Sequence, residues 1–592
     1  MGSILLNGND LTREQVIEIA INNAHVSTDV SKLANSRDYI VNKVQDLKII
    51  YGVTTGFGSN ADKMIEEKDT LQLQLNLLRS HACGVGNNFS TEIVRAIMAI
   101  RLNTLLKGHS GVQDSTVKQL EFLINNLIHP LIPEQGSVGA SGDLCPLSHM
   151  ALPLIGEGEV RFTDLDGSVK EMDTKDFLLT GKAKSIGFKP TTLSYKEGLA
   201  LTNGTTVMAA AATIALYKAE NLLKVGTLSS ALIFESLGAR KDAFAYKKIH
   251  QARNHTGQTQ IADWLTILLD GSKLINISQK EILAHILDAY LIDDTEILDC
   301  LNELNAEKAH DRQQQIPDWV IDKLKGARQK EVATMLAFAK KKWKPQDSYS
   351  IRCLPQVFGA SKTAIDHVIS VIDNELNAAC DNPLIFAEDD KVVSGGNFHG
   401  QPIALVMDYL KLAVAEMGNI MERQINKMVD SNTNDCMPSF LIQGTGLNNG
   451  LMIPQYAAAS IVSENKVLVH PASADSIPTC ENTEDHVSMG TIAARQAIQI
   501  CENVERISAI ALLTGFYSIN MRLLQFASVG MESKAEAVLA PSTLELYHAI
   551  KVANKELQNP DFIKTDRFLS PEIKVIGKNL GIFGTIAEKY LQ

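Results

Sequence analysis

The chain has 592 residues, of which 45% are hydrophobic and 21% charged, as expected for a soluble globular protein with a large core. Its formal net charge of −12 argues against nucleic acid or an anionic membrane as its main partner. The eight cysteines are dispersed, with no CxxC pair, so we expect free thiols in the reducing cytoplasm. The N-terminus lacks a secretory signal pattern, and no apolar run approaches transmembrane length.

The elements predicted along the chain are mostly helical. Residues 1 to about 205 alternate short helices with Gly-rich loops, and residues 159–162 and 167–169 indicate a small hairpin. An Ala-rich buried helix is expected over 207–223, and apolar residues at helical spacing predict long helices over 401–427 and 493–519. The sequence therefore predicts a mainly α fold with long central helices.

Residues 287–345 differ from the rest of the chain in composition. They are rich in Asp, Glu, Lys and Gln, and they end in the basic stretch 340–345. The Leu-Asn-Glu-Leu-Asn pattern at 301–305 suggests amphipathic surface helices. A solvated helical elaboration is favoured over a regulatory or interface role, because charge runs usually form solvated faces.

The run Gly139-Ala140-Ser141-Gly142-Asp143 carries the most specific chemical signal. In a tight turn, the amide nitrogen of Gly142 can attack the carbonyl carbon of Ala140, and dehydration of Ser141 then leaves an exocyclic methylidene. The product is a methylidene-imidazolone (MIO), an electrophile that no standard side chain supplies. Glycine suits the third position because it has no Cβ and tolerates a compressed backbone. The tripeptide alone should occur by chance in about one chain in five of this length, so its context decides.

Other catalytic motifs are poorly matched. Asp143 occupies the position of the last glycine in a G-x-S-x-G nucleophile elbow. The run 359–363 has no glycine at the spacing that a phosphate loop requires. There is no HExxH motif, and the 14 histidines show no metal-ligand spacing. We therefore expect neither a metal nor a nucleotide cofactor.

Seven further segments accompany the tripeptide and span most of the chain. They cover residues 51–58, 77–86, 196–205, 346–353, 374–383, 395–400 and 484–490. The first reads Tyr-Gly-Val-Thr-Thr-Gly-Phe-Gly, and the last reads Glu-Asp-His-Val-Ser-Met-Gly. Together, and in this order, they resemble the segments of the histidine and aromatic amino-acid ammonia-lyase family.

The resemblance implies an architecture and an assembly. It implies a long central helix bundle of the fumarase/aspartase-like type and an N-terminal, loop-rich domain bearing the prosthetic group. We expect an N-terminal domain over 1–205, a bundle over 206–535 with an insertion at 287–345, and a C-terminal helical cap over 536–592. The family's homotetramers share active sites between subunits, so Tyr51, Arg352 and Glu484 are expected from different chains.

The resemblance also implies residue roles for removing ammonia from an amino acid. Tyr51 is the candidate base for the β-proton, although free tyrosine has a pKa near ~10 and needs a positive or hydrogen-bonding environment. Arg352 would pair with the substrate carboxylate through its planar fork. The remaining expected roles are a second catalytic phenol, two polar groups that position substrate and ring, and a shield for the ring: Tyr349, Gln346 and Asn203, and Phe398.

The substrate is inferred from two positions. Histidine enzymes of the family typically carry Ser-His where this chain has Ser80-His81, and Glu484 also resembles the histidine type. An imidazole has a donor and an acceptor that a histidine and a carboxylate can meet, whereas a phenyl ring would leave Glu484 unpartnered. The interpretation favours deamination of L-histidine to trans-urocanate. A tyrosine or phenylalanine ammonia-lyase, an aromatic aminomutase and a catalytically silent helical scaffold remain alternatives.

Overall fold

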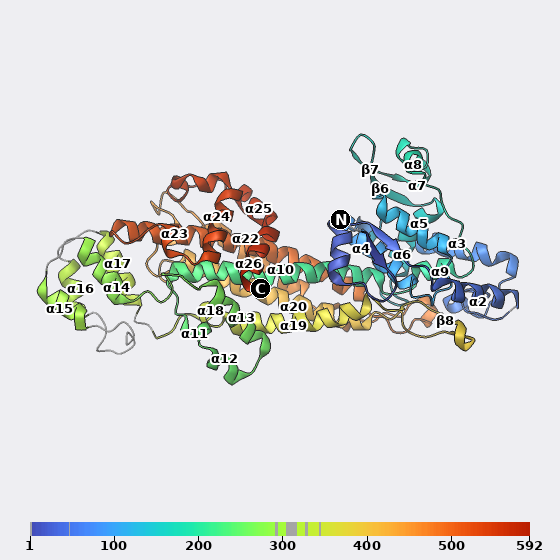
Figure 1. Ribbon diagram of the computed structural model, residues 1–592, viewed down its shortest axis with the longest axis horizontal. Coiled ribbons are helices and arrows are strands. Elements are labelled where there is room, and N and C mark those ends of the chain that lie inside the picture. Colours follow the sequence, from blue (N-terminus) through green and yellow to red (C-terminus); the bar gives the residue numbers. More distant parts are fainter. Residues whose placement is uncertain (1–2, 47, 290–293, 304–316, 326–329, 343–344) are drawn as a thin grey trace. The chain divides into compact units, whose positions relative to one another are not determined.

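The computed structural model describes residues 3–46, 48–289, 294–303, 317–325, 330–342 and 345–592 (Figure 1). These residues form two compact units, each built from three separated stretches of chain. The first contains residues 1–217, 366–411 and 469–499, and the second contains 218–365, 412–468 and 500–592. The domain boundaries expected near residues 205 and 535 stay a prediction.

Four long helices contribute residues to both units. They are α10 (Thr206–Leu237), α19 (Leu354–Glu375), α20 (Gln401–Val429) and α22 (Gly490–Ser528). Three of them contain the long helices predicted at 207–223, 401–427 and 493–519, and each extends beyond the predicted bounds. The prediction of a mainly helical fold is confirmed.

The first unit combines short helices with small sheets. Its helices are α1 (Arg13–Ala20), α2 (Leu33–Gln45), α3 (Thr70–His81), α4 (Thr91–Leu105), α5 (Asp114–Asn125), α6 (Leu144–Ala151), α7 (Thr174–Phe177), α8 (Gly181–Ile186) and α9 (Glu197–Thr202). Its strands are β1 (Ile4–Leu6), β2 (Val26–Thr28), β3 (Val85–Asn88), β4 (His129–Pro130), β5 (Pro133–Gln135), β6 (Glu159–Thr163), β7 (Val169–Asp173), β8 (Leu384–Phe386) and β9 (Lys391–Val393).

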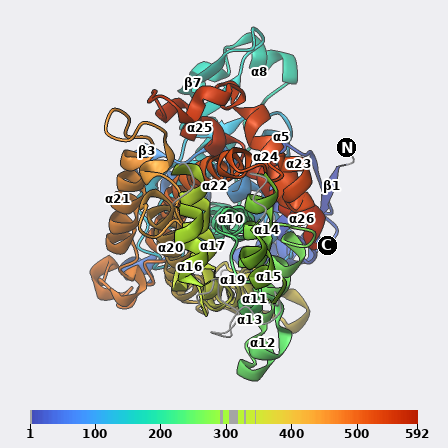
Figure 2. The same ribbon diagram turned by 90° about the vertical axis from the view of Figure 1, so that its left-hand side faces the viewer.

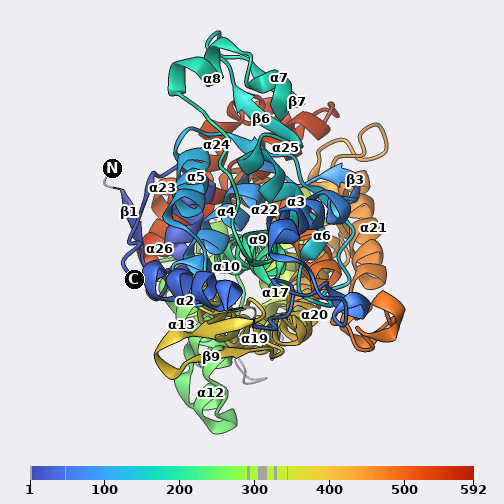
Figure 3. The same ribbon diagram turned by 90° about the vertical axis from the view of Figure 1, so that its right-hand side faces the viewer.

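The sheets are two- or three-stranded among the described residues. β1 pairs with β2, β3 with β5 and β8 with β9, and the largest sheet has the order β4-β6-β7. β6 and β7 are antiparallel, with Glu159 opposite Asp173 and Thr163 opposite Val169, which confirms the predicted hairpin. Figure 3 shows this sheet with α7 beside it.

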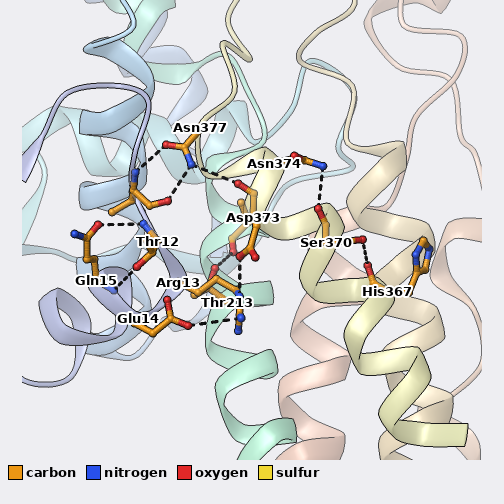
Figure 4. A network of polar contacts seen from close by, with 12 residues as sticks. Thr12, Arg13, Glu14, Gln15, Thr213, His367, Ser370, Asp373, Asn374 and Asn377 are labelled. Carbon is orange, nitrogen blue, oxygen red and sulfur yellow. Dashed lines mark hydrogen bonds and ion pairs between the residues drawn. The ribbon is translucent and has the colours of Figure 1, made fainter. Parts of the chain in front are cut away.

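The start of the first unit is hydrogen-bonded to the last turn of α19 and to the residues just after it (Figure 4). Thr12 caps α1 through a reciprocal pair of hydrogen bonds with Gln15, a capping box that satisfies otherwise unpaired amides. Arg13 Nε donates to Asp373 Oδ1 at 2.7 Å. Asn377 both accepts from the backbone of Leu11 and donates to it, each at 2.9 Å. Side-chain hydrogen bonds, not a shared sheet, therefore connect two segments that lie 360 positions apart in the sequence.

The described part of the second unit consists of helices joined by loops. Besides segments of the four long helices it contains α11 (Asp242–Ala245), α12 (Lys247–Arg253), α13 (Thr256–Leu268), α14 (Gln279–Ala289), α15 (Thr295–Glu303), α16 (Asp318–Lys325), α17 (Lys330–Lys341), α18 (Tyr349–Arg352), α21 (Met452–Leu468), α23 (Ala535–Val538), α24 (Pro541–Ala553), α25 (Ser570–Lys578) and α26 (Leu580–Leu591). Polar pairs join the long helices: Lys218 Nζ lies 3.0 Å from Glu505 Oε1, and Ser230 Oγ donates to Gln424 Oε1 at 2.9 Å.

The charged segment 287–345 contains the helices predicted for it. α15, α16 and α17 lie within it, and Figure 2 shows them with α14 facing the viewer. Each has a buried apolar side, represented by Ile297, Val320 and Met335. Residues 304–305 of the Leu-Asn-Glu-Leu-Asn pattern and residues 343–344 of the basic stretch lie outside the described residues.

One expectation about apolar runs is wrong. Among the described residues, α22 is long and apolar enough to cross a membrane, yet 89% of its most apolar stretch is buried within the protein. A helix surrounded by other elements is apolar on every side, as a membrane helix is. The apolar run in α22 is therefore accounted for by its burial in this protein.

Candidate active site

The Ala140-Ser141-Gly142 turn lies in the first unit, just before α6, where α3, α6 and α9 pack together. Gly142 has a φ of +74° and bridges to Gly204: the Asp143 amide donates to the Gly204 carbonyl at 2.7 Å, and the Gly204 amide donates to the Ser141 carbonyl at 3.2 Å. A Cβ on Gly142 would lie 2.1 Å from the Gly204 oxygen. Only glycine fits this position, because any other residue would be strained at this positive φ and its Cβ would collide with the Gly204 backbone.

Asp143 anchors the turn. Its Oδ2 accepts 2.9 Å hydrogen bonds from the amides of Val207 and Met208, so it also caps α10. Its Oδ1 accepts from Ser137 Oγ at 3.0 Å and from the Thr491 hydroxyl. Complete burial raises the pKa of Asp143, and these four donors oppose that rise. Sequence reasoning missed this role, because the cap signal of an acidic residue at this position points to α6, whereas the Asp143 side chain bonds to the start of α10.

Glu484 contacts the turn and belongs to the last of the three chain stretches that form the first unit. Its Oε1 accepts from Ser141 Oγ at 2.8 Å, and its Oε2 accepts from Thr479 Oγ1 at 2.7 Å. Backbone hydrogen bonds between Thr479 and Glu484 close the loop that presents this carboxylate. Two predicted site residues, more than 340 positions apart, are thus in direct contact.

Tyr51 lies near the same carboxylate. Its hydroxyl accepts from the Gly58 amide at 2.9 Å. Burial is the largest influence and raises the pKa of Tyr51; the Gly58 bond opposes this rise, and the charges of Glu484 and Cys480 add to it. The described surroundings therefore favour the neutral phenol, although sequence analysis called for a setting that favours the phenolate.

His81 is the last residue of α3 and is half-buried. Its Nδ1 lies 2.9 Å from Ser80 Oγ. Burial lowers the pKa of His81, while the Leu77 backbone and the charge of Glu484 act in the opposite direction. Because the net direction is downward, the neutral imidazole is favoured. The first unit thus gathers Tyr51, His81 and Ser141 around one carboxylate.

Asn203 and Phe398 also belong to the first unit. Asn203 ends α9 immediately before Gly204 and is buried, and its Oδ1 has no hydrogen-bond partner among the described residues. An unpaired buried acceptor is costly, so it indicates a position for a donor on another group. Phe398 is half-buried in the loop before α20, two residues ahead of Gly400, whose backbone packs against Met208.

The other three predicted site residues belong to the second unit. Tyr349 and Arg352 are the first and last residues of α18, and the Arg352 guanidinium carbon lies 4.5 Å from the centre of the Tyr349 ring. Arg352 Nε donates to the Asp347 carbonyl at 3.0 Å, and Tyr349 is 70% exposed. Gln346 and Arg352 line a cavity of about 420 Å³. Tyr349 and Arg352 lie on one face of α18, as expected, with the Arg352 guanidinium stacked on the Tyr349 ring.

No cluster of three or more metal-ligating side chains is found in the part of the chain that the structure describes. The candidate site in the first unit therefore combines the turn, which has no room for a Cβ at Gly142, with the Glu484 carboxylate, the neutral His81 imidazole and the Tyr51 phenol.

The sequence matches the aromatic amino acid lyase family over residues 11–550. The chain belongs to this family. The predicted family is confirmed, and the protein is an enzyme of the lyase class. A histidine ammonia-lyase of Alkaliphilus metalliredigens is 40% identical over 522 residues, with 88% of each chain covered.

Solved structures agree with this assignment. A histidine ammonia-lyase of Trypanosoma cruzi is 32% identical and has a TM-score of 0.78, with 100% of this chain and 96% of that chain covered. A tyrosine aminomutase of Streptomyces globisporus is 30% identical and has a TM-score of 0.79, with 99% and 98% covered.

Proposed function

We propose that this lyase is a histidine ammonia-lyase, which converts L-histidine to trans-urocanate and ammonia. The observation that carries the proposal is the contact of Glu484 with Ser141, with a neutral His81 nearby. A carboxylate that accepts and a neutral histidine that can donate suit the two nitrogens of an imidazole. The names of the relatives and of the T. cruzi structure support the same substrate.

The proposal includes an MIO group made from Ala140, Ser141 and Gly142. Three observations fit it: the absence of room for a Cβ at Gly142, the four donors that fix Asp143, and the unpaired buried Oδ1 of Asn203. When formed, the group supplies an electrophilic carbon for the departing amine. Loss of the Ser141 hydroxyl removes the donor to Glu484 Oε1, which leaves that oxygen available to a substrate N–H.

Tyr51 would take the β-proton at its phenol oxygen. The Gly58 amide already points at this oxygen, so it would stabilise a phenolate. The charge of Glu484 works against ionisation of Tyr51 while the carboxylate faces no cation. A neutral substrate imidazole that donates to Glu484 does not cancel that charge, so the Gly58 amide is the group that would favour ionisation of Tyr51.

Arg352 would hold the substrate carboxylate, with Gln346 positioning the substrate, Tyr349 acting as a second phenol, and Phe398 shielding the ring. The 70% exposure of Tyr349 suits a side chain that functions beside another subunit. We further propose a cytoplasmic homotetramer in which Tyr51, Arg352 and Glu484 of one active site come from different chains, acting on a free amino acid.

The decisive experiment is substrate profiling of the purified enzyme with L-histidine, L-tyrosine and L-phenylalanine, measuring ammonia, the unsaturated acid and any β-amino acid. Preference for histidine with urocanate as the product is expected. Preference for tyrosine or phenylalanine would overturn the substrate assignment. Formation of a β-amino acid would favour an aminomutase, the alternative supported by the S. globisporus structure. Intact mass tests the prosthetic group separately, because its formation removes two waters.

A further inference from the structure

Two free thiols lie at the edge of the candidate active site, and the proposed chemistry uses neither. Cys83 follows His81 by two residues, and Cys145 is the second residue of α6, three residues after Gly142. Cys83 is exposed and Cys145 is buried. One thiol of the pair is therefore open to solvent, and the other lies on α6, the helix that begins directly after the turn.

Backbone contacts bring the two cysteines together. The amide of Gly84, the residue after Cys83, donates to His149 Nε2 on α6 at 3.0 Å. Cys145 and His149 are one turn apart, so they lie on the same face of α6. A Cβ on Gly136 would lie 2.6 Å from Cys145 Sγ and 3.3 Å from the Gly84 Cα, so a single glycine separates that sulfur from the Cys83 segment.

The two thiols differ in their surroundings. Burial raises the pKa of Cys145 to about 11, and the neighbouring Cys83 also influences it. Because a thiol reacts as its thiolate, the buried Cys145 is protected from a dissolved oxidant while the exposed Cys83 is open to it. This division is typical of a cysteine that reacts first and a neighbour that resolves the product.

We propose that Cys83 and Cys145 form a modification site at which a peroxide converts the two thiols reversibly into a disulfide. The Cys83 sulfur takes one oxygen from hydrogen peroxide, which gives a sulfenic acid and one water. The Cys145 sulfur then displaces the hydroxyl from Cys83: the S–O bond breaks, an S–S bond forms, and the hydroxyl leaves as a second water with the thiol proton. Two thiols lose two electrons, which reduce one peroxide.

The new bond would disturb the substrate site. A disulfide requires the sulfurs to approach to about 2.05 Å, closer than any hydrogen-bonded contact. α6 is held by buried side chains such as Leu147 and Met150, so the more exposed Cys83 segment must move. That movement draws His81 away from Glu484. Because misplacement by about 1 Å can cost ~10²-fold, we expect at least a tenfold loss of kcat/KM for histidine. This consequence, unlike the disulfide itself, rests on the proposed function.

The test is oxidation of the purified full-length enzyme by a small excess of hydrogen peroxide. Denaturing thiol counts should fall by two, intact mass should fall by two hydrogens, and peptide mapping should find Cys83 joined to Cys145. Activity should fall in step, and thioredoxin with its reductase should restore it. A joined pair with unchanged activity would overturn the effect on the substrate site but leave the disulfide standing.

Three variants make the test specific. Cys83→Ser and Cys145→Ala should keep basal activity, form no joined peptide and resist inactivation, whereas Cys300→Ser, at a half-buried cysteine of the second unit, should behave as wild type. Two results would overturn the proposal: Cys83 oxidised to the sulfinic acid with Cys145 still a free thiol, or inactivation of Cys83→Ser at the wild-type rate. If Cys145→Ala does not fold, Cys83→Ser and the peptide map still decide.

Discussion

The Ser141 hydroxyl donates a 2.8 Å hydrogen bond to Glu484 Oε1. This bond joins the residue expected to lose its hydroxyl to the residue expected to recognise the substrate ring. The same carboxylate oxygen would serve both partners in turn, first the serine and then a substrate N–H. Under the proposed function, Glu484 would therefore have a role before catalysis begins as well as during it.

Ser141→Ala should abolish the loss of two waters and nearly all turnover, because alanine has no hydroxyl to eliminate. The fold should survive, since the change removes one side-chain hydrogen bond to a half-buried carboxylate. Intact mass, ammonia release and thermal unfolding measure the three effects. Ammonia release near the wild-type rate would refute the prosthetic-group proposal.

Asp143→Asn should slow maturation of the turn. The amide oxygen of the variant can still accept from one pair of donors, but its amide nitrogen would face the other pair, which are also donors. Each lost charged hydrogen bond is worth about 1.5–3 kcal/mol. We expect freshly purified variant to contain a fraction that still has both waters, visible by intact mass and declining on incubation. Asp176→Asn, at an exposed aspartate of α7, is the matched control. Full maturation of Asp143→Asn at isolation would show that the anchor is dispensable.

His81→Leu combined with Glu484→Gln should weaken histidine turnover and admit tyrosine or phenylalanine. The single changes should be strongly coupled, since each leaves the other polar group unpaired. Discrimination built on buried hydrogen bonds can reach about 10⁴-fold, so the change in kcat/KM ratios should be large. Glu481→Gln, three residues earlier and exposed, serves as the control. Strict additivity of the two substitutions would contradict a shared imidazole site.

Arg352→Lys should raise KM and lower kcat, because a point charge replaces a fork that can bind two oxygens and stack on Tyr349. A loss of about 1.5–3 kcal/mol corresponds to one to two orders of magnitude in kcat/KM. Steady-state kinetics with histidine measures it, beside Arg253→Lys at an exposed arginine of α12. An unchanged kcat/KM would remove Arg352 from the carboxylate site.

Glu235 should make stability depend on pH. It is buried on α10, its Oε1 accepts from the Ala540 amide at 2.8 Å, and burial raises its pKa from 4.5 to about 7. As pH rises above 4.5 the unfolded chain ionises first, so the contribution of Glu235 to stability is full below pH 4.5 and is lost through pH 7. The loss is on the order of 3 kcal/mol. Glu235→Gln should therefore flatten the fall in Tm between pH 5 and 8; an equal fall in both proteins would contradict this prediction.

The sequence predicted the fold where a local pattern determines the structure. Apolar spacing located α20 and α22. It did not show that α10 continues past Leu223 to Leu237, where buried hydroxyls such as Thr227 are satisfied by the carbonyl one turn back. The candidate site residues were predicted from their motifs, whereas the contact between Ser141 and Glu484 depends on tertiary packing across 343 positions. The raised pKa of Tyr51 was unforeseen for the same reason: its causes are burial and neighbours distant in sequence.

Asp143 takes its four donors from Ser137, Val207, Met208 and Thr491, so the anchor is complete only when the last of these has been synthesised and packed. The order of events during biosynthesis follows from this. If the proposed group forms only on the complete anchor, a growing chain that still lacks Thr491 would carry an ordinary serine. Truncated chains would therefore remain chemically inert, and the proportion of unmodified serine in a preparation would record how many molecules never folded correctly.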